Sequence, residues 1–160
     1  VQKQKKEGSL ACLLSHLYLW GKIYNQKNDE ISLIFEDDCK ILPNFNQKLQ
    51  EAIHNAPEDW DMIWLGYNKI KGQKVSDHYY KPFKGYHWGY NSQHHCYLIK
   101  RKAFPKLQKI LLPVKKNFNT KDTVLRINFD KFNAYFYKER LAVQDVDEFP
   151  TSERTGNKNG

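Results

Sequence analysis

The stretch Ile31-Ser32-Leu33-Ile34-Phe35-Glu36-Asp37-Asp38 gives the clearest structural signal in this sequence. Its first five residues are mostly apolar, with β-branched isoleucines, and have the length and composition of a buried strand. Three consecutive acidic residues then end the apolar run. The pattern predicts a strand over residues 31–35 that has carboxylates at its carboxyl end.

Helices and strands are predicted to alternate on both sides of this strand. Apolar residues at helical spacing predict one helix that starts after Ser9 as N-cap and continues to about residue 25. The same spacing predicts further helices over residues 45–53, 103–112 and 120–129. Strands are predicted over residues 62–65, 95–99, 134–137 and 141–143. The polar, aromatic segment 68–90 is predicted to be a long loop with room for an edge hairpin.

This alternation indicates one α/β domain over residues 1–160, with a mostly parallel, Rossmann-like sheet flanked by helices. A chain of 160 residues can bury the core of one such domain. The polar ends, residues 1–7 and 150–160, are expected to be flexible. Ligands of parallel sheets collect at the carboxyl ends of the strands, so we expect the acidic triplet at the mouth of a binding site.

The charge balance favours an anionic partner. Lys and Arg number 26 against 18 acidic residues, a formal net charge of +8. Such a charge attracts nucleic acid, phosphorylated substrates or an acidic membrane surface. The basic residues are scattered and no RNA-binding aromatic signature accompanies them, so nucleic acid is not an expected partner. Peripheral contact with an acidic membrane remains open.

The sequence also carries signals about location. It has no apolar run of the ~20 residues needed to cross a membrane and no leader-like segment. Its three cysteines are odd in number, which favours reduced thiols. The abundance of Lys, Asn, Ile and Tyr is typical of an AT-rich genome. We therefore expect a cytoplasmic protein, in a bacterial cytosol or, for a virus, in the host cytoplasm or virion.

The acidic triplet is the strongest candidate for chemistry. Adjacent carboxylates repel one another unless a cation neutralises them. Alternate residues at a strand end point the same way, so Glu36 and Asp38 are expected to face one pocket and Asp37 the other side. Carboxylate oxygens suit Mn²⁺ or Mg²⁺, which would neutralise the diphosphate of a sugar nucleotide. A solvated acidic turn is the structural alternative.

Four segments, in order, resemble glycosyltransferase family 25, which includes bacterial lipooligosaccharide sugar transferases and collagen galactosyltransferases. The first is the helix Gly8-Ser9-Leu10-Ala11-Cys12-Leu13-Leu14-Ser15-His16, and the second is the strand with its acids, Leu33-Ile34-Phe35-Glu36-Asp37-Asp38. The third is Asp59-Trp60-Asp61-Met62-Ile63-Trp64-Leu65-Gly66. The fourth begins at His95-Cys96-Tyr97-Leu98-Ile99 and continues to Ala103. Together they cover most of residues 8–145.

The resemblance implies a GT-A fold and a UDP-hexose donor, with galactose or glucose as the sugar. It implies Mn²⁺, or Mg²⁺, held by Glu36 and Asp38. It also implies inverting transfer to a hydroxyl group of a glycan or a hydroxylysine-type protein acceptor. Asp122 is the candidate for the general base that such transfer needs. The residues implied to contact the donor are Gly8, Ser9, Cys12, His16, Asp37 and His95.

Two departures from the family leave alternatives open. Family members usually have a strand and an Arg-rich turn before the first helix, and this chain starts almost at the helix. Lys100 also stands where the family usually has Ser. A weakened grip on the nucleotide would give a UDP-sugar hydrolase or a nucleotide-sugar-binding relic. The remaining alternatives are a basic module for acidic glycans or nucleic acid and, for Asp122 alone, a helix cap.

Overall fold

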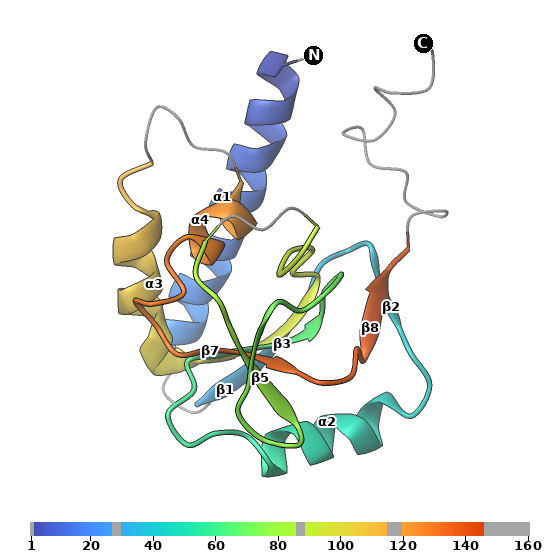
Figure 1. The fold of residues 1–160 in the computed structure, drawn as a ribbon. Coiled ribbons are helices and arrows are strands. Elements are labelled where there is room, and N and C mark those ends of the chain that lie inside the picture. The colour runs from blue at the N-terminus through green and yellow to red at the C-terminus, as the bar shows by residue number, and fades with distance from the viewer. Residues whose placement is uncertain (1, 27–29, 86–88, 115–119, 146–160) are drawn as a thin grey trace.

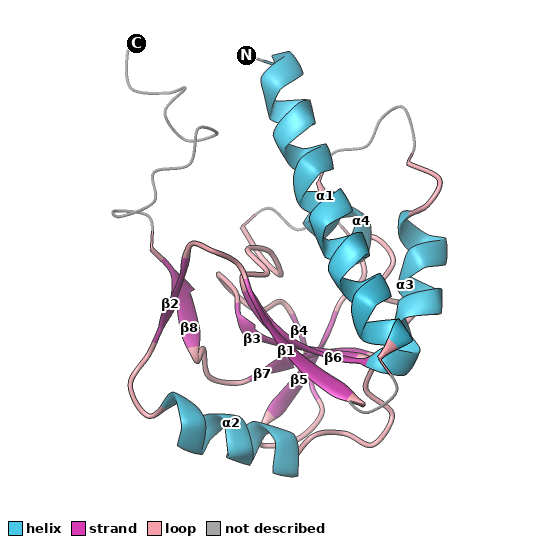
Figure 2. Ribbon diagram, turned by 180° about the vertical axis from the view of Figure 1, so that it is seen from behind, coloured by secondary structure: helices cyan, strands magenta, loops and turns pink. Residues whose placement is uncertain are grey.

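The computed structural model describes residues 2–26, 30–85, 89–114 and 120–145. A mixed sheet forms the centre, with helices on both faces (Figures 1 and 2). The strands are β1 (Ile31–Phe35), β2 (Cys39–Ile41), β3 (Met62–Gly66), β4 (Gly72–Lys74), β5 (Tyr79–Pro82), β6 (Cys96–Lys100), β7 (Ala134–Tyr137) and β8 (Ala142–Gln144). The helices are α1 (Gln2–Asn25), α2 (Phe45–His54), α3 (Phe104–Leu111) and α4 (Lys121–Arg126), with a 3₁₀ turn at Arg101–Ala103.

Most predicted elements are confirmed, and two details differ. The segment 68–90 contains the expected hairpin, formed by β4 and β5. Ser9 was predicted as an N-cap, but α1 begins at Gln2, so Ser9 lies inside the helix and that prediction is wrong. The short strand β2 was not predicted, because it holds only three residues after the acidic triplet.

The prediction of a mostly parallel sheet is wrong. The main sheet runs in the order β1-β6-β3-β7-β5-β4, and most of its neighbours are antiparallel. Parallel pairing occurs between β3 and β7 and between β3 and β8. The helix α2 does carry the chain from β1 to a parallel strand, β3, but the antiparallel β6 lies between them. Apolar runs look alike in either direction, so the sequence pattern could not reveal this insertion.

The sheet separates two apolar layers. The layer toward α1, α3 and α4 holds aromatic side chains such as Trp20, Trp64, Tyr97 and Phe136. The layer toward α2 holds residues of the opposite strand faces, such as Leu98. Successive residues of β6 therefore point to opposite layers, as strand geometry requires.

The strands β1, β3 and β7 run parallel to one another and end at the same edge of the sheet. The acidic triplet follows β1 at this edge, as the sequence predicts. Among the described residues, no helix is long and apolar enough to cross a membrane. The predicted flexible tail, residues 150–160, lies outside the described ranges.

Candidate functional site

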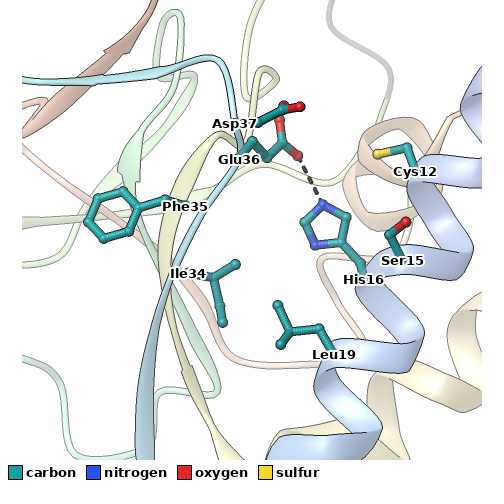
Figure 3. Close-up of a pocket in the computed structure, with 8 residues that line it drawn as sticks. All are labelled: Cys12, Ser15, His16, Leu19, Ile34, Phe35, Glu36 and Asp37. Carbon is teal, nitrogen blue, oxygen red and sulfur yellow. Dashed lines mark hydrogen bonds and ion pairs between the residues drawn. The ribbon is translucent and has the colours of Figure 1, made fainter.

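A cavity of about 410 Å³ lies between α1 and the carboxyl end of β1 (Figure 3). Helix α1 lines one wall and β1 with the first two acids lines the other. The lining residues are Cys12, Ser15, His16, Leu19, Ile34, Phe35, Glu36 and Asp37. Residues from two of the four resembling segments therefore face one another across a single cavity.

His16 sits at the floor of this cavity and is fixed by buried aromatic residues. Its Nδ1 lies 2.6 Å from the hydroxyl of Tyr97, to which Trp20 Nε1 donates at 2.9 Å. Its Nε2 lies 3.0 Å from Oε1 of Glu36. Burial lowers the pKa of His16 from its ordinary value, although the hydrogen bond to Glu36 acts to raise it. The imidazole is therefore held rigidly at the junction of helix and sheet.

Glu36 is balanced by a buried cation. Lys121, at the start of α4, donates to Oε1 of Glu36 at 2.8 Å, and its Nζ also lies 2.8 Å from Nε2 of His16. The Lys121 side chain is only 3% exposed. Burial raises the pKa of Glu36, but the hydrogen bond from His16 and the charge of Lys121 outweigh burial and lower the pKa overall. Glu36 is thus an ionised carboxylate with an internal counter-ion.

A second group of potential metal ligands meets at this point. The ligand atoms of Cys12, His16 and Glu36 lie within 4.8 Å of one another. The ammonium of Lys121 already contacts two of the three. Because a buried cation sits beside these atoms, their geometry does not fit a further metal ion there.

The acidic triplet does not point Glu36 and Asp38 into one pocket. Glu36 and Asp37 line the cavity, and Asp37 is exposed. Asp38 is 8% exposed and accepts a hydrogen bond from Gln144 of β8. The alternation expected for Glu36 and Asp38 does not hold, because the strand ends at Phe35 and the next residues form a turn. The structure therefore does not bring these two predicted metal ligands together in this cavity.

Asp38 nevertheless keeps one carboxylate oxygen without a partner. Its Oδ1 is buried and has no hydrogen bond. A buried carboxylate oxygen without a donor or cation carries a substantial desolvation cost. This oxygen is the observation that fits a metal ion at Asp38, with one protein ligand from the triplet where the sequence suggested two.

The other donor-contact candidates occupy different positions. Gly8 is exposed and Ser9 half-buried, one turn before Cys12, and neither lines the cavity. His95 is buried, with Nε2 3.2 Å from the carbonyl oxygen of Ala142, and burial lowers its pKa. Of the predicted donor contacts, the structure brings together Cys12, His16 and Asp37.

Asp122 holds a loop in place. Its Oδ2 accepts from the backbone N–H of Gln93 at 3.0 Å, and its Oδ1 lies 3.1 Å from Nδ1 of the buried His94. Burial raises the pKa of Asp122, but the charges of His94 and Lys121 prevail and hold it well below the usual range. A carboxylate so stabilised is a weak proton acceptor. The contacts favour a structural role for Asp122.

Sequence reasoning missed the groups that complete this site. Lys121 gave no signal, because a single lysine beside an acid at a helix start is ordinary. Tyr97 belongs to a predicted strand and to the fourth resembling segment, and Trp20 lies within the first predicted helix, but neither pattern indicates a contact with His16. Their roles depend on contacts across 77 and more positions of the chain.

Comparisons with known proteins place the chain among the glycosyltransferases. The matching family model is described as "Glycosyltransferase family 25 (LPS biosynthesis protein)" and covers residues 2–122. The chain therefore belongs to glycosyltransferase family 25. The match includes both walls of the cavity and ends at the pair Lys121 and Asp122.

Similar proteins include a relative named as a galactosyltransferase and a relative named as inactive. The chain is 36% identical over 67 residues to procollagen galactosyltransferase 1-A of Xenopus laevis, covering 40% of this chain and 11% of the relative. It is 30% identical over 66 residues to a glycosyltransferase 25 family member of Aedes aegypti, with 40% and 11% covered. It is 28% identical over 71 residues to the inactive glycosyltransferase 25 family member 3 of Homo sapiens, with 42% and 12% covered. The matched segments thus span about a tenth of these relatives' length.

Proposed function

We propose that this chain transfers a hexose, galactose or glucose, from a UDP-sugar to a hydroxyl group of a glycan or protein acceptor. The observation that carries the proposal is the acidic turn at the carboxyl end of β1, beside the cavity that α1 closes. Family membership and the galactosyltransferases among the relatives support the reaction class. The positive net charge of +8 suits a donor that carries a diphosphate.

The proposal includes a divalent cation, Mn²⁺ or Mg²⁺, bound at Asp38. Its support is the buried Oδ1 of Asp38, which has no hydrogen-bond partner. When bound, the ion would neutralise charge on the diphosphate leaving group. Glu36 takes no part in this binding, because Lys121 and His16 hold its Oε1.

In the proposed reaction the acceptor oxygen forms a bond to the anomeric carbon, and the bond from that carbon to the phosphate oxygen breaks. UDP leaves, the acceptor hydroxyl loses a proton to a base, and the anomeric configuration inverts. Residues of both walls position the donor: His16 of α1 is fixed by Tyr97, and Cys12 of α1 and Asp37 after β1 border the same cavity. Helix α1 forms the wall of the cavity on this side of the donor.

Calorimetry of UDP-galactose and UDP-glucose, with and without Mn²⁺, tests the donor site. We expect metal-dependent binding that Asp38→Asn abolishes. Asp77→Asn is the control, because Asp77 is an exposed acid whose side chain is 88% accessible. Binding that is unchanged in Asp38→Asn, or that needs no metal, would remove the metal from the proposal.

Product analysis tests the reaction. Incubation of donor with a hydroxyl acceptor should yield a glycoside, whose configuration NMR determines. Free sugar in equal amount with and without acceptor would instead identify a UDP-sugar hydrolase. Failure to bind any UDP-sugar would identify a relic without donor binding.

A further inference from the structure

A second cavity, of about 490 Å³, opens beyond the carboxyl end of β3. Nothing in the donor site uses it. Its walls combine three tyrosine rings with three cationic side chains, and none of the described residues that line it is acidic. The six side chains are Tyr67, Tyr80, Tyr90, Lys69, Lys138 and Arg140. We refer to this cavity as the tyrosine cleft.

Side-chain hydrogen bonds of two asparagines hold the wall of the tyrosine cleft in place without a ligand. Asn68 Nδ2 donates to the carbonyl of Gly89 at 2.6 Å. Asn91, which is 1% exposed, donates from Nδ2 to the carbonyl of Lys71 at 2.8 Å and accepts from the Lys71 N–H at 2.9 Å. These bonds fasten the segment after β3 to the segment before β6. The cleft therefore needs little ordering when a ligand enters.

The positive charge of the tyrosine cleft is not neutralised locally. Lys69, Lys138 and Arg140 are exposed, and in the described ranges none of them forms an ion pair with a carboxylate. The acid between the latter two, Glu139, is bound instead by Lys48. Such a surface attracts anions and binds an anionic ligand in preference to a neutral one.

The rings supply flat surface for the rest of the ligand. Tyr90 is 37% exposed, and the ammonium of Lys71 lies 5.9 Å from its ring centre. Tyr67 is fixed by a hydrogen bond from its hydroxyl to the carbonyl of Tyr137 at 2.6 Å. Aromatic faces bury the apolar face of a sugar ring, and convergent polar groups fix its orientation. Rings and cations together fit a sugar that carries a negative group.

The tyrosine cleft opens at the same edge of the sheet as the donor cavity. Phe35 and Gly66 both pair with Cys96, one on each side of β6. The segments that follow them therefore start about 10 Å apart, two strand spacings. Tyr67 also packs against Phe136 in the layer that holds Tyr97, so both cavities open on the same face of the sheet.

We propose that the tyrosine cleft is the acceptor site and that it binds a saccharide bearing a carboxylate or phosphate group. Its role as acceptor site rests on the proposed transferase function, whereas its affinity for an anionic saccharide does not. A cleft at the same edge and on the same face as the donor cavity presents the acceptor to the donor sugar. The cations select acidic acceptors, and the tyrosines select sugar rings.

Two tetrasaccharides of equal length and linkage test this binding by calorimetry on the 160-residue chain. Tetragalacturonate carries four carboxylates, and maltotetraose carries none. We expect tetragalacturonate to bind at least about 10-fold more tightly, because charge attraction adds to stacking. Arg140→Gln and Tyr90→Ala should each weaken it about 5- to 10-fold. Lys109→Gln is the control, because Lys109 is an exposed lysine of α3 outside the cleft.

Several results would overturn the proposal. Equal loss in Lys109→Gln would show binding to general positive charge, and tighter binding of a single-stranded oligonucleotide would make the cleft a nucleic-acid surface. An unchanged affinity for tetragalacturonate in Tyr90→Ala would show that Tyr90 does not stack on the saccharide. UDP-galactose is titrated in parallel on the same variants. If tetragalacturonate binds and UDP-galactose does not, the cleft stands as a glycan site and the transferase proposal fails. If UDP-galactose binds and tetragalacturonate does not, the proposed glycan site is refuted and the transferase proposal stands.

Discussion

Lys121 Nζ lies 2.8 Å from Oε1 of Glu36, although 85 positions separate the two residues in the chain. This ion pair joins the start of α4 to the carboxyl end of β1, and His16 of α1 shares it. Helices α1 and α4 and the carboxyl end of β1 therefore meet at the carboxylate of Glu36. The pair neutralises inside the protein a carboxylate that the sequence assigned to a metal ion.

Removal of the buried cation should destabilise the domain. Lys121→Met leaves Glu36 without its counter-ion, and loss of one partner of a buried pair costs roughly 3–5 kcal/mol. We place this variant toward the lower end, because the Glu36 side chain is 24% exposed. Urea unfolding measures the change. Lys109→Met, on the exposed face of α3, should stay within about 0.5 kcal/mol. Equal stability of both variants would contradict the role of the pair.

The substitution Asp122→Asn distinguishes a structural role of Asp122 in a loop contact from a catalytic role as general base. We expect the substitution to lower stability, because His94 loses its carboxylate partner. We expect transfer activity to fall by less than about 10-fold when it is measured well below the melting temperature. A general base contributes about 10²–10⁴-fold. A loss of that size with an unchanged melting temperature would establish Asp122 as the base.

Stability should decrease as the pH falls below neutrality. Burial lowers the pKa of His16 in the folded state, so between its folded pKa and 6.5 the unfolded chain binds the extra proton. Folding free energy is then lost with decreasing pH, by at most ~1.4 kcal/mol per pH unit for one proton. Chemical unfolding between pH 5 and 7.5 measures the slope. The slope should become shallower in His16→Gln and stay unchanged in His54→Gln, since His54 is exposed.

Gly66 should not tolerate a side chain. A Cβ there would lie 2.5 Å from the His95 ring and 2.8 Å from Cβ of Cys96. Overpacking of this kind costs about 1–3 kcal/mol, so Gly66→Ala should lower the melting temperature. Gly21→Ala is the matched control. Its Cβ meets only the Phe104 ring at 3.6 Å, and Ala in a helix is favoured over Gly by about 0.5–1 kcal/mol. A destabilised Gly21→Ala with an unaffected Gly66→Ala would contradict this packing.

Much of the fold was predictable because its signals are local. The β1 and β7 bounds follow from apolar runs, and α2 follows from helical spacing after Pro43. Strand direction was not predictable, because an apolar strand such as β6 carries no mark of its orientation. The boundary at Ser9 failed because a polar, lysine-rich segment can still continue a helix.

The candidate site was predictable only in part. The resemblance implied that His16 and Asp37 contact the donor, and both side chains line the cavity. The alternation after β1 predicted Glu36 and Asp37 on opposite sides, and the structure has both at the same cavity. The separation of Asp38 from Glu36 depends on a turn and on β8, whose Gln144 lies 106 positions away. Lys121 depends on the packing of α4 against α1. Contacts of this kind arise from the tertiary structure and leave no periodic pattern in the sequence.

The position of β6 between β1 and β3 also sets the order in which the chain can fold during synthesis. β1 and β3 emerge early but do not pair with each other, since each uses an edge to bind β6. Until residues 96–100 leave the ribosome, both apolar strands keep unpaired edges, which are prone to join other chains. The first half of the chain therefore completes its sheet only when a later strand arrives.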